Sequence, residues 1–155
     1  MAPLTQDTQR TWALHQPQIL PLPAAAGAVL YVGALVATIG SGRAVPASDT
    51  AGLVVQGVCR EGLNNANGAA GTLGTTGDYT DAVRYVRVDT HGEWLFQVIG
   101  GSPKPGGIAY VVDDNTVSAA FTNNTVQAGR FTRPYGPSAW FIDIERVPGA
   151  EPPVE

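Results

Sequence analysis

Short runs of alternating hydrophobic and polar residues follow one another along this chain, and glycine, proline, asparagine or aspartate separates them. Residues 108–112 form an apolar, β-branched run, and the acidic turn 113–115 follows at once. Aspartate and asparagine tolerate left-handed backbone and bond to their own main chain, so they favour a hairpin turn. We therefore predict a hairpin whose return strand begins at Val117. Strand side chains alternate in direction, so three residues of the first strand share one face: Ile108, Tyr110 and Val112.

A second hairpin is predicted over residues 83–99. Residues 83–89 and 93–99 both have the composition of a strand, and the Thr-His-Gly turn at 90–92 separates them. One face of the second run carries Trp94, Phe96 and Val98. These large apolar side chains make that face a candidate for the core.

The remaining strand signals complete an all-β pattern. Residues 27–39 hold two short apolar runs, residues 52–59 are apolar on both faces, as in a strand buried on both sides, and residues 138–145 form the last strand. No segment has the 3.6-residue period of a helix, and about eight to ten short strands follow one another at turn spacing. We therefore expect an all-β fold, either a compact β-sandwich or a small, β-tulip-like β-barrel.

The chain divides into an arm, one domain and a tail. Residues 1–23 hold four prolines, which exclude a regular helix or a central strand, yet they also carry large apolar side chains. Such an extended arm suits packing on a neighbouring molecule or on its own domain, and both interpretations stay open. Residues 24–147 are the predicted single β domain, and residues 148–155 are a short frayed tail. Within the domain, residues 61–81 predict a long loop that is mobile or ordered only against a neighbour.

Composition narrows the classes of partner. Charged residues make up 14% of the chain and the net charge is −4, which gives no basic surface for nucleic acid. A surface this poor in charge suits partial cover by another molecule. The apolar stretch 24–39 has 16 residues, fewer than the ~20 that span a bilayer, and the segment before it lacks the basic start of a signal peptide. We expect no membrane partner and a protein made in the reducing cytoplasm.

Few residues have the spacing of a catalytic or metal site. Cys59 stands alone in an apolar run and is expected to be a buried small hydrophobic residue. We interpret the adjacent carboxylates at 113–114 as turn residues, because neighbouring strand residues point to opposite faces. Asp89, His91 and Glu93 suggest a metal cluster, but they surround a tight turn and no second cluster supplies ligands, so a solvated turn is favoured. We expect no catalytic, cofactor-binding or metal-binding residues and no enzymatic activity.

Three blocks of the chain follow one another in a distinctive order. The first, 27–58, is an apolar hairpin followed by a strand that ends in Gly-Val. The second, 105–117, reads Pro-Gly-Gly-Ile-Ala-Tyr-Val-Val-Asp-Asp-Asn-Thr-Val. The third joins Ala-Gly at 128–129, through a Pro/Gly turn, to the strand Ala-Trp-Phe-Ile-Asp-Ile at 139–144. In this order the blocks resemble the head decoration proteins of bacteriophages, also known as capsid cement or capsid-stabilising proteins.

The resemblance implies a compact, often trimeric β-fold on the outer face of an icosahedral shell. There it would act as a structural virion protein that bridges major capsid proteins against the pressure of the packaged DNA. The implied partners are the major capsid protein and further copies in a homotrimer, with no cofactor. Because tryptophan and arginine anchor many interfaces, we expect the contacts to come from the arm: Arg10, Trp12, Leu14, Ile19 and Leu20.

The alternative hypothesis is a β-rich host- or carbohydrate-binding module of a head fibre or tail structure. Four aromatic residues would then supply flat platforms for a ligand: Trp94, Tyr110, Tyr135 and Trp140. Their exposure separates the two hypotheses, because a ring buried in the core cannot stack on a ligand.

Overall fold

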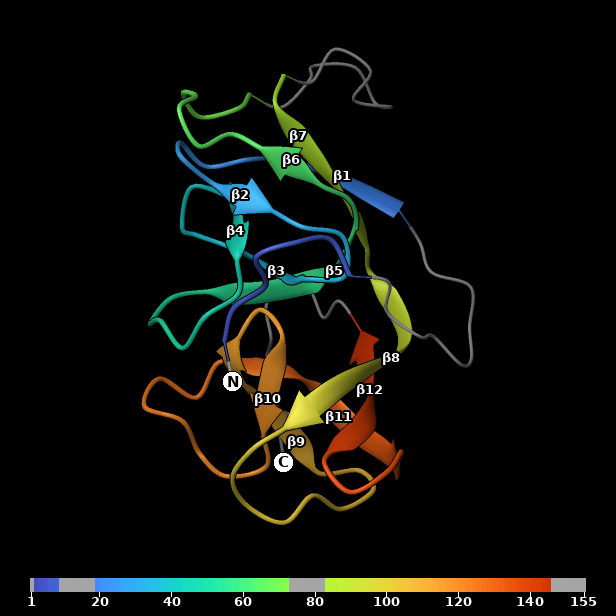
Figure 1. The fold of residues 1–155 in the computed structure, drawn as a ribbon. Helices are drawn as coiled ribbons and strands as arrows, with labels where there is room; N and C mark the ends of the chain where they lie inside the picture. The colour runs from blue at the N-terminus through green and yellow to red at the C-terminus, as the bar shows by residue number, and fades with distance from the viewer. Residues whose placement is uncertain (1, 9–18, 73–82, 146–155) are drawn as a thin grey trace.

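The computed structural model of the chain describes residues 2–8, 19–72 and 83–145, and its regular elements are all strands (Figure 1). The all-β expectation is therefore confirmed. The described residues form twelve strands, more than the pattern predicts, because several are too short to show alternation. The strands are β1 (Ile19–Pro23), β2 (Val29–Leu30), β3 (Leu35–Thr38), β4 (Ala44–Pro46), β5 (Val54–Glu61), β6 (Leu63–Asn64), β7 (Tyr85–Asp89), β8 (His91–Val98), β9 (Ile108–Asp113), β10 (Thr116–Ser118), β11 (Gln127–Pro134) and β12 (Ala139–Glu145). In this described part, no helix has the length and apolar character needed to cross a membrane.

A closed barrel, an open sheet and a two-stranded cover lie one above the other. The barrel has the strand order β10-β8-β12-β11-β9 and closes where β9 pairs with β10. The open sheet has the order β1-β7-β5-β3-β4, and β2 pairs with β6 in the cover. Figure 1 shows the barrel in the lower half, the sheet above it, and β2 and β6 farther from the barrel. The compact fold therefore combines a small barrel with a packed sheet.

The open sheet is buried on both faces, because alternate side chains of its central strands enter two different cores. On the barrel side, Leu35 and Val58 pack with the barrel interior; we name this the barrel core. On the opposite side, Val36 and Cys59 pack under the cover; we name this the alanine core, after its commonest residue. Two-sided burial, predicted for residues 52–59, is thus confirmed for Val58 and Cys59 at the end of this run, whereas Val54 at the start of β5 is 39% exposed.

The barrel interior includes the face of residues 93–99 that the sequence pattern selected as a candidate for the core. Trp94 and Phe96 of β8 and Ile142 and Ile144 of β12 are at most 5% exposed and belong to the barrel core. The two strands pair over their whole length, so these side chains form one continuous layer. Burial of each such side chain contributes about 1.5–3 kcal/mol to stability.

The hairpin predicted over residues 108–118 is confirmed. Asp113 pairs with Thr116, which leaves Asp114 and Asn115 as a two-residue turn between β9 and β10. The Asp113 carboxylate accepts a hydrogen bond from Asn115 N at 2.8 Å. This is the local bond to the main chain that makes aspartate favourable in a turn.

The hairpin predicted over residues 83–99 is wrong. β7 pairs with β1 and β5 of the open sheet, whereas β8 pairs with β12 and β10 of the barrel. Thr90 therefore carries the chain from one layer to the other instead of reversing it. Gly92 has a φ of +123°, which side chains disfavour, and so it accommodates the bend. The chain does bend at residues 90–92, but the strands on either side of the bend pair with strands far away in the sequence and not with each other.

The last part of the predicted arm belongs to the domain itself. Residues 19–23 form β1, which pairs with β7 at the edge of the open sheet. Pro21 and Pro23 suit this edge. Ala24 N donates to Arg84 O at 2.8 Å, so by antiparallel alternation the proline nitrogens face away from β7. Pro23 is buried, whereas at the half-buried Pro21 the free edge lacks an N–H group and resists pairing with another strand.

Part of the segment predicted as a mobile loop, residues 61–81, is ordered on its own domain. β6 pairs with β2 within this stretch. Asn65 is buried, and its Nδ2 donates to Ala25 O at 3.1 Å and to Ala69 O at 2.9 Å. These bonds tie the cover to the strand connections beneath it. Residues 73–82 lie outside the described residues.

Candidate functional site

The predicted contact residues fall at the start of β1 and before it. Ile19 is 47% exposed, which leaves its side chain available to a partner. Leu20 is half-buried and packs against the alanine core, so it contributes to the stability of this chain's own fold. Arg10, Trp12 and Leu14 lie outside the described residues.

The N-terminal residues 2–8 bind to both bodies of the molecule. Leu4 N donates to the Asp114 carboxylate in the barrel hairpin at 2.8 Å. Val32 N donates to the Asp7 carboxylate at 2.9 Å, beside the open sheet. A Cβ atom on Gly33 would lie 1.8 Å from Thr8 O, so only glycine permits this approach. The segment thus joins barrel and sheet, as an arm packed on its own domain would.

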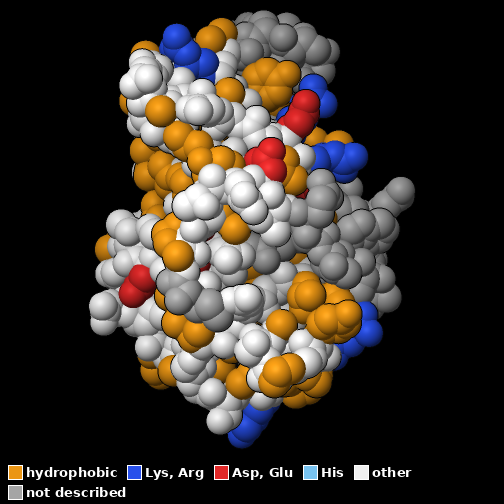
Figure 2. Space-filling view, in the orientation of Figure 1, with side chains coloured by type: hydrophobic (Ala, Val, Ile, Leu, Met, Phe, Trp, Pro, Cys, Tyr) orange, Lys and Arg blue, Asp and Glu red, His pale blue; other side chains and the backbone are white. Residues whose placement is uncertain are grey.

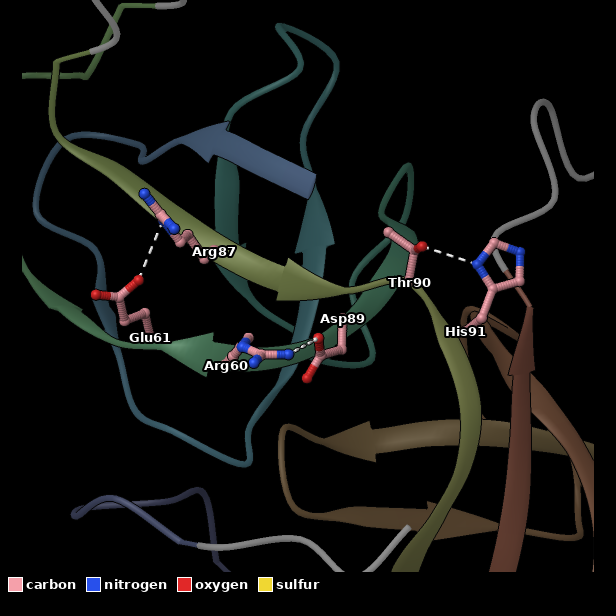
Figure 3. Close-up of polar contacts among 6 residues, drawn as sticks. All are labelled: Arg60, Glu61, Arg87, Asp89, Thr90 and His91. Atoms are coloured by element: carbon pink, nitrogen blue, oxygen red, sulfur yellow. Dashed lines mark hydrogen bonds and ion pairs between the residues drawn. The ribbon is translucent and has the colours of Figure 1, made fainter. Parts of the chain in front are cut away.

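Asp89, His91 and Glu93 do not converge on a common point. Figure 3 shows the Asp89 carboxylate turned toward Arg60 and the His91 ring turned away, toward Thr90. Arg60 donates to Asp89 at 3.3 Å, and Thr90 Oγ1 lies 2.8 Å from His91 Nδ1. In the ranges that the structure describes, no three His, Cys, Asp or Glu side chains are grouped so as to hold a metal ion.

Two carboxylates at this junction are buried rather than solvated. Asp89 is 5% exposed, and burial raises the pKa of its carboxyl above the ordinary value, while the hydrogen bond from Arg60 opposes the shift. Glu93 is 6% exposed, and its Oε2 lies 3.8 Å from Arg133 Nε. The solvated turn expected for residues 89–93 is therefore wrong, because this strand is enclosed where it passes between the two layers.

The other groups considered for chemistry have structural surroundings. Cys59 is 1% exposed, as predicted, and burial raises the pKa of its thiol to about 12, so the thiolate nucleophile is not formed at neutral pH. Asp113 and Asp114 bind different groups, the first Asn115 N and the second Leu4 N. Asp113 thus stabilises the turn, and Asp114 holds the N-terminal segment on the barrel.

The four aromatic residues proposed as ligand platforms differ in exposure. Trp94 and Tyr110 are 5% and 8% exposed, so their faces are not available. Trp140 is half-buried, and its ring centroid lies 5.6 Å from that of Phe131. Tyr135 is exposed, but its ring packs edge-on against Phe141 with centroids 5.7 Å apart. A platform built from all four rings is therefore excluded.

An exposed aromatic residue that sequence analysis missed lies on the connection after β10. Phe121 is 80% exposed, more than any other large hydrophobic residue among those described. Its ring centroid lies 5.3 Å from that of Tyr110, which covers only part of the ring. The available signal was weak: a single phenylalanine in a stretch of small and uncharged polar residues that closes a strand.

Charged side chains are distributed unevenly over the surface. On the face shown in Figure 2, several blue and red side chains lie in the upper part, toward the sheet and the cover, and separate blue and red side chains also lie in the lower part among white and orange surface. Arg60, Glu61 and Arg87 lie on strands of the open sheet and take part in ion pairs. On the barrel, the exposed residues Lys104, Arg130 and Arg133 carry charge, whereas the segments 94–103 and 115–129 contain no charged residue.

Comparison of the chain with protein-family models, with curated proteins and with solved structures found no match.

Proposed function

We propose that this chain is a non-enzymatic structural protein of a bacteriophage virion. It binds the outer face of the capsid and stabilises the shell by bridging major capsid proteins. The order of the blocks over residues 27–58, 105–117 and 128–144 supports this assignment through their resemblance to head decoration proteins. The copies are expected to act as homotrimers on the shell, without nucleic acid, membrane or cofactor as partners.

The observation that carries the proposal is the surface of the barrel end. Ile99, which is 38% exposed, and Phe121, which is 80% exposed, lie on barrel connections within the segments 94–103 and 115–129, and these segments contain no charged residue. A surface of this kind is suited to a partner that removes it from water. Many identical copies on one shell would add modest single contacts through avidity.

The side chains with titratable groups support a structural function. Cys59 is buried with a raised thiol pKa, and Asp89 and Glu93 face the arginines Arg60 and Arg133. Nucleophilic catalysis needs an activated group beside a positioned base. These groups instead lie in packed surroundings or in ion pairs within the open sheet and within the barrel.

Co-sedimentation with phage heads tests the proposal. The purified full chain is added to expanded heads prepared without it, and bound protein is quantified in the pellet. We expect saturable binding at a copy number fixed by the symmetry of the shell. Trp12→Ala should weaken binding if the arm makes contact, and Gln6→Ala serves as an exposed control near the same terminus. A folded protein that does not bind the heads would overturn the proposal and favour the host- or carbohydrate-binding alternative.

A further inference from the structure

The loop at residues 119–125, hereafter the Phe121 loop, presents one large apolar side chain to solvent. Phe121 is 80% exposed, whereas Tyr135, the next most exposed aromatic residue among those described, is 61% exposed and packs on Phe141. An aromatic ring left in water gives up the hydrophobic stabilisation that burial would supply. Its position is therefore better explained by a partner than by the fold of this chain alone.

The far end of the loop is held by a residue from the open sheet. Asp49, in the connection between β4 and β5, accepts hydrogen bonds from Asn123 N at 2.9 Å and Asn124 N at 2.8 Å through its two carboxylate oxygens. Asn124 Nδ2 also donates to Asp49 O at 2.6 Å. Charged acceptors make stronger hydrogen bonds than neutral ones. The carboxylate thus fixes the loop across a separation of 75 residues.

The first residues of the loop are held by Ser118 and by the backbone of Gly100. Ser118 Oγ accepts from Ala120 N and donates to Ala120 O, each at 3.0 Å. Ala119 N donates to Gly100 O at 3.1 Å, and a Cβ atom on Gly101 would lie 2.6 Å from Ala120 N. The loop therefore sits directly on the Gly100–Gly101 backbone. A loop fixed at both ends loses little further freedom when it binds, which favours affinity.

The Phe121 loop and the segment beneath it, which contains Gly100 and Gly101, have no charged residues. Residues 94–103 and 115–129, which meet where Ile99 N donates to Val117 O, hold none. The Asp49 carboxylate nearby already accepts two backbone N–H groups. Electrostatic complementarity then calls for a partner surface that is itself uncharged. An anionic membrane or a nucleic acid does not meet that condition.

We propose that the Phe121 loop is a preformed docking element that inserts Phe121 into an apolar pocket, rimmed by neutral polar groups, on the surface of a protein. This inference rests on the proposed function, so the pocket is assigned to the major capsid protein of the shell. A single exposed aromatic anchor with rigid support has the properties of an interface hot spot. A carbohydrate ligand is less suited, because the adjacent Tyr110 is 8% exposed and offers no second platform.

Equilibrium binding to phage heads, with matched variants, tests this assignment. Phe121→Ala should raise Kd by about tenfold or more, as expected for a hot-spot residue. Tyr135→Ala removes another exposed barrel aromatic and should leave Kd within about twofold. Asp49→Ala keeps the ring but frees the loop, so its Kd should lie between those two, with faster dissociation. Circular dichroism and denaturant unfolding verify that each variant folds.

The salt dependence of binding provides a second readout. A contact without charge should change in Kd by less than about threefold between about 0.05 and 0.5 M NaCl, because there is no ionic attraction to screen. The difference in Kd between the native protein and Phe121→Ala should also persist at both salt concentrations. A contact that depends on arginine side chains of the arm would instead weaken steeply.

The remaining outcomes separate this inference from the proposed function. Equal binding of the native protein and Phe121→Ala overturns the inference and leaves the proposed function standing. No binding by the folded native protein overturns the proposed function itself. Sedimentation velocity of the free protein identifies a second copy as the occupant if Phe121→Ala abolishes self-association, and this also overturns the capsid assignment. A neutral glycan retained by the native protein but lost by Phe121→Ala overturns it as well.

Discussion

The two cores on either side of the open sheet are filled in opposite ways. The barrel core contains large aromatic side chains, with Trp94, Phe96 and Phe131 buried and Trp140 packed against them. The alanine core has eleven buried residues, of which five are alanine and none is aromatic. The first core therefore gains stability from side-chain volume, and the second from the close approach of backbones.

Glycine contacts show how thin the second layer is. A Cβ atom on Gly62 would lie 2.5 Å from Leu30 O, and one on Gly71 would lie 2.4 Å from Arg84 O. Such distances are shorter than a carbon atom permits, so the cover can lie this close only with glycine at these positions. The two cores should consequently fail in different ways: the barrel core by loss of volume and the alanine core by added volume.

The largest effect is expected from Phe96→Ala in the barrel core. Phe96 is 1% exposed, and its removal leaves a cavity, so the free energy of unfolding should fall by about 3–5 kcal/mol. Urea unfolding measures the change. Phe121→Ala is the matched control, because this exposed phenylalanine should cost less than about 1 kcal/mol. Similar losses for the two variants would contradict the packing described for the barrel.

A smaller loss is expected from Ala44→Leu in the alanine core. Ala44 is fully buried, and the added atoms must displace packed neighbours, which costs about 1–3 kcal/mol. The same substitution at Ala66, which is exposed on the cover, should change the free energy of unfolding by less than about 0.5 kcal/mol. If Ala44→Leu stabilised the protein, the second core would contain unfilled space and the contrast between the cores would be wrong.

A weaker, pH-dependent effect is expected at Asp89, where the chain passes between the layers. Burial raises the pKa of this carboxyl in the folded protein, so the folded state holds the proton more tightly than the unfolded state. The resulting stabilisation is complete below the unfolded pKa and is lost as pH rises through the folded pKa. Urea unfolding between about pH 3.5 and 7 should show this fall in the native protein.

The variant Asp89→Asn isolates that contribution, because the amide does not titrate in this range. The difference in free energy of unfolding between the native protein and Asp89→Asn should shift in favour of the variant as pH rises. Arg60 donates to Asp89 at 3.3 Å and limits the size of the shift. Parallel pH profiles for the two proteins would show that Asp89 titrates in the folded state as it does when unfolded.

The smallest effect on stability is expected at the edge strand β1. Replacing the half-buried Pro21 by valine restores an N–H group at the free edge, and should change the free energy of unfolding by only about 1 kcal/mol. Self-association should nevertheless increase with protein concentration, because the edge becomes able to pair. Sedimentation velocity measures this, with Pro103→Val in the connection before β9 as the control. If Pro21→Val stayed monomeric, Pro21 would not be what protects the edge.

Local patterns in the sequence predicted the strands and many of their faces. The aspartate-rich turn at residues 113–115, the inward face of Trp94 and Phe96, and the burial of Cys59 are all confirmed. Each depends on alternation or on turn chemistry within a few residues, which the sequence shows directly. The position of a proline-rich strand at a sheet edge follows from the same local chemistry.

The candidate surface was less predictable. The arm residues Arg10, Trp12 and Leu14 were selected by residue type, and they lie outside the described residues, so their contribution stays a prediction. Phe121 was not selected, because exposure on a fixed loop depends on Asp49, which is 72 positions from it in the chain. No local pattern links two residues at that separation.

The sequence by itself determined that this protein is built from strands, where most of them lie, and which side chains point together. The tertiary structure alone decided which strands pair. At Thr90 the chain passes from the open sheet into the barrel, where the sequence predicted a hairpin. The tertiary structure also decided that a thin layer of alanine and glycine would cover one face of the sheet. The physical reason is range: backbone conformation is set by neighbours in the chain, whereas strand pairing is set by burial shared among residues far apart in it.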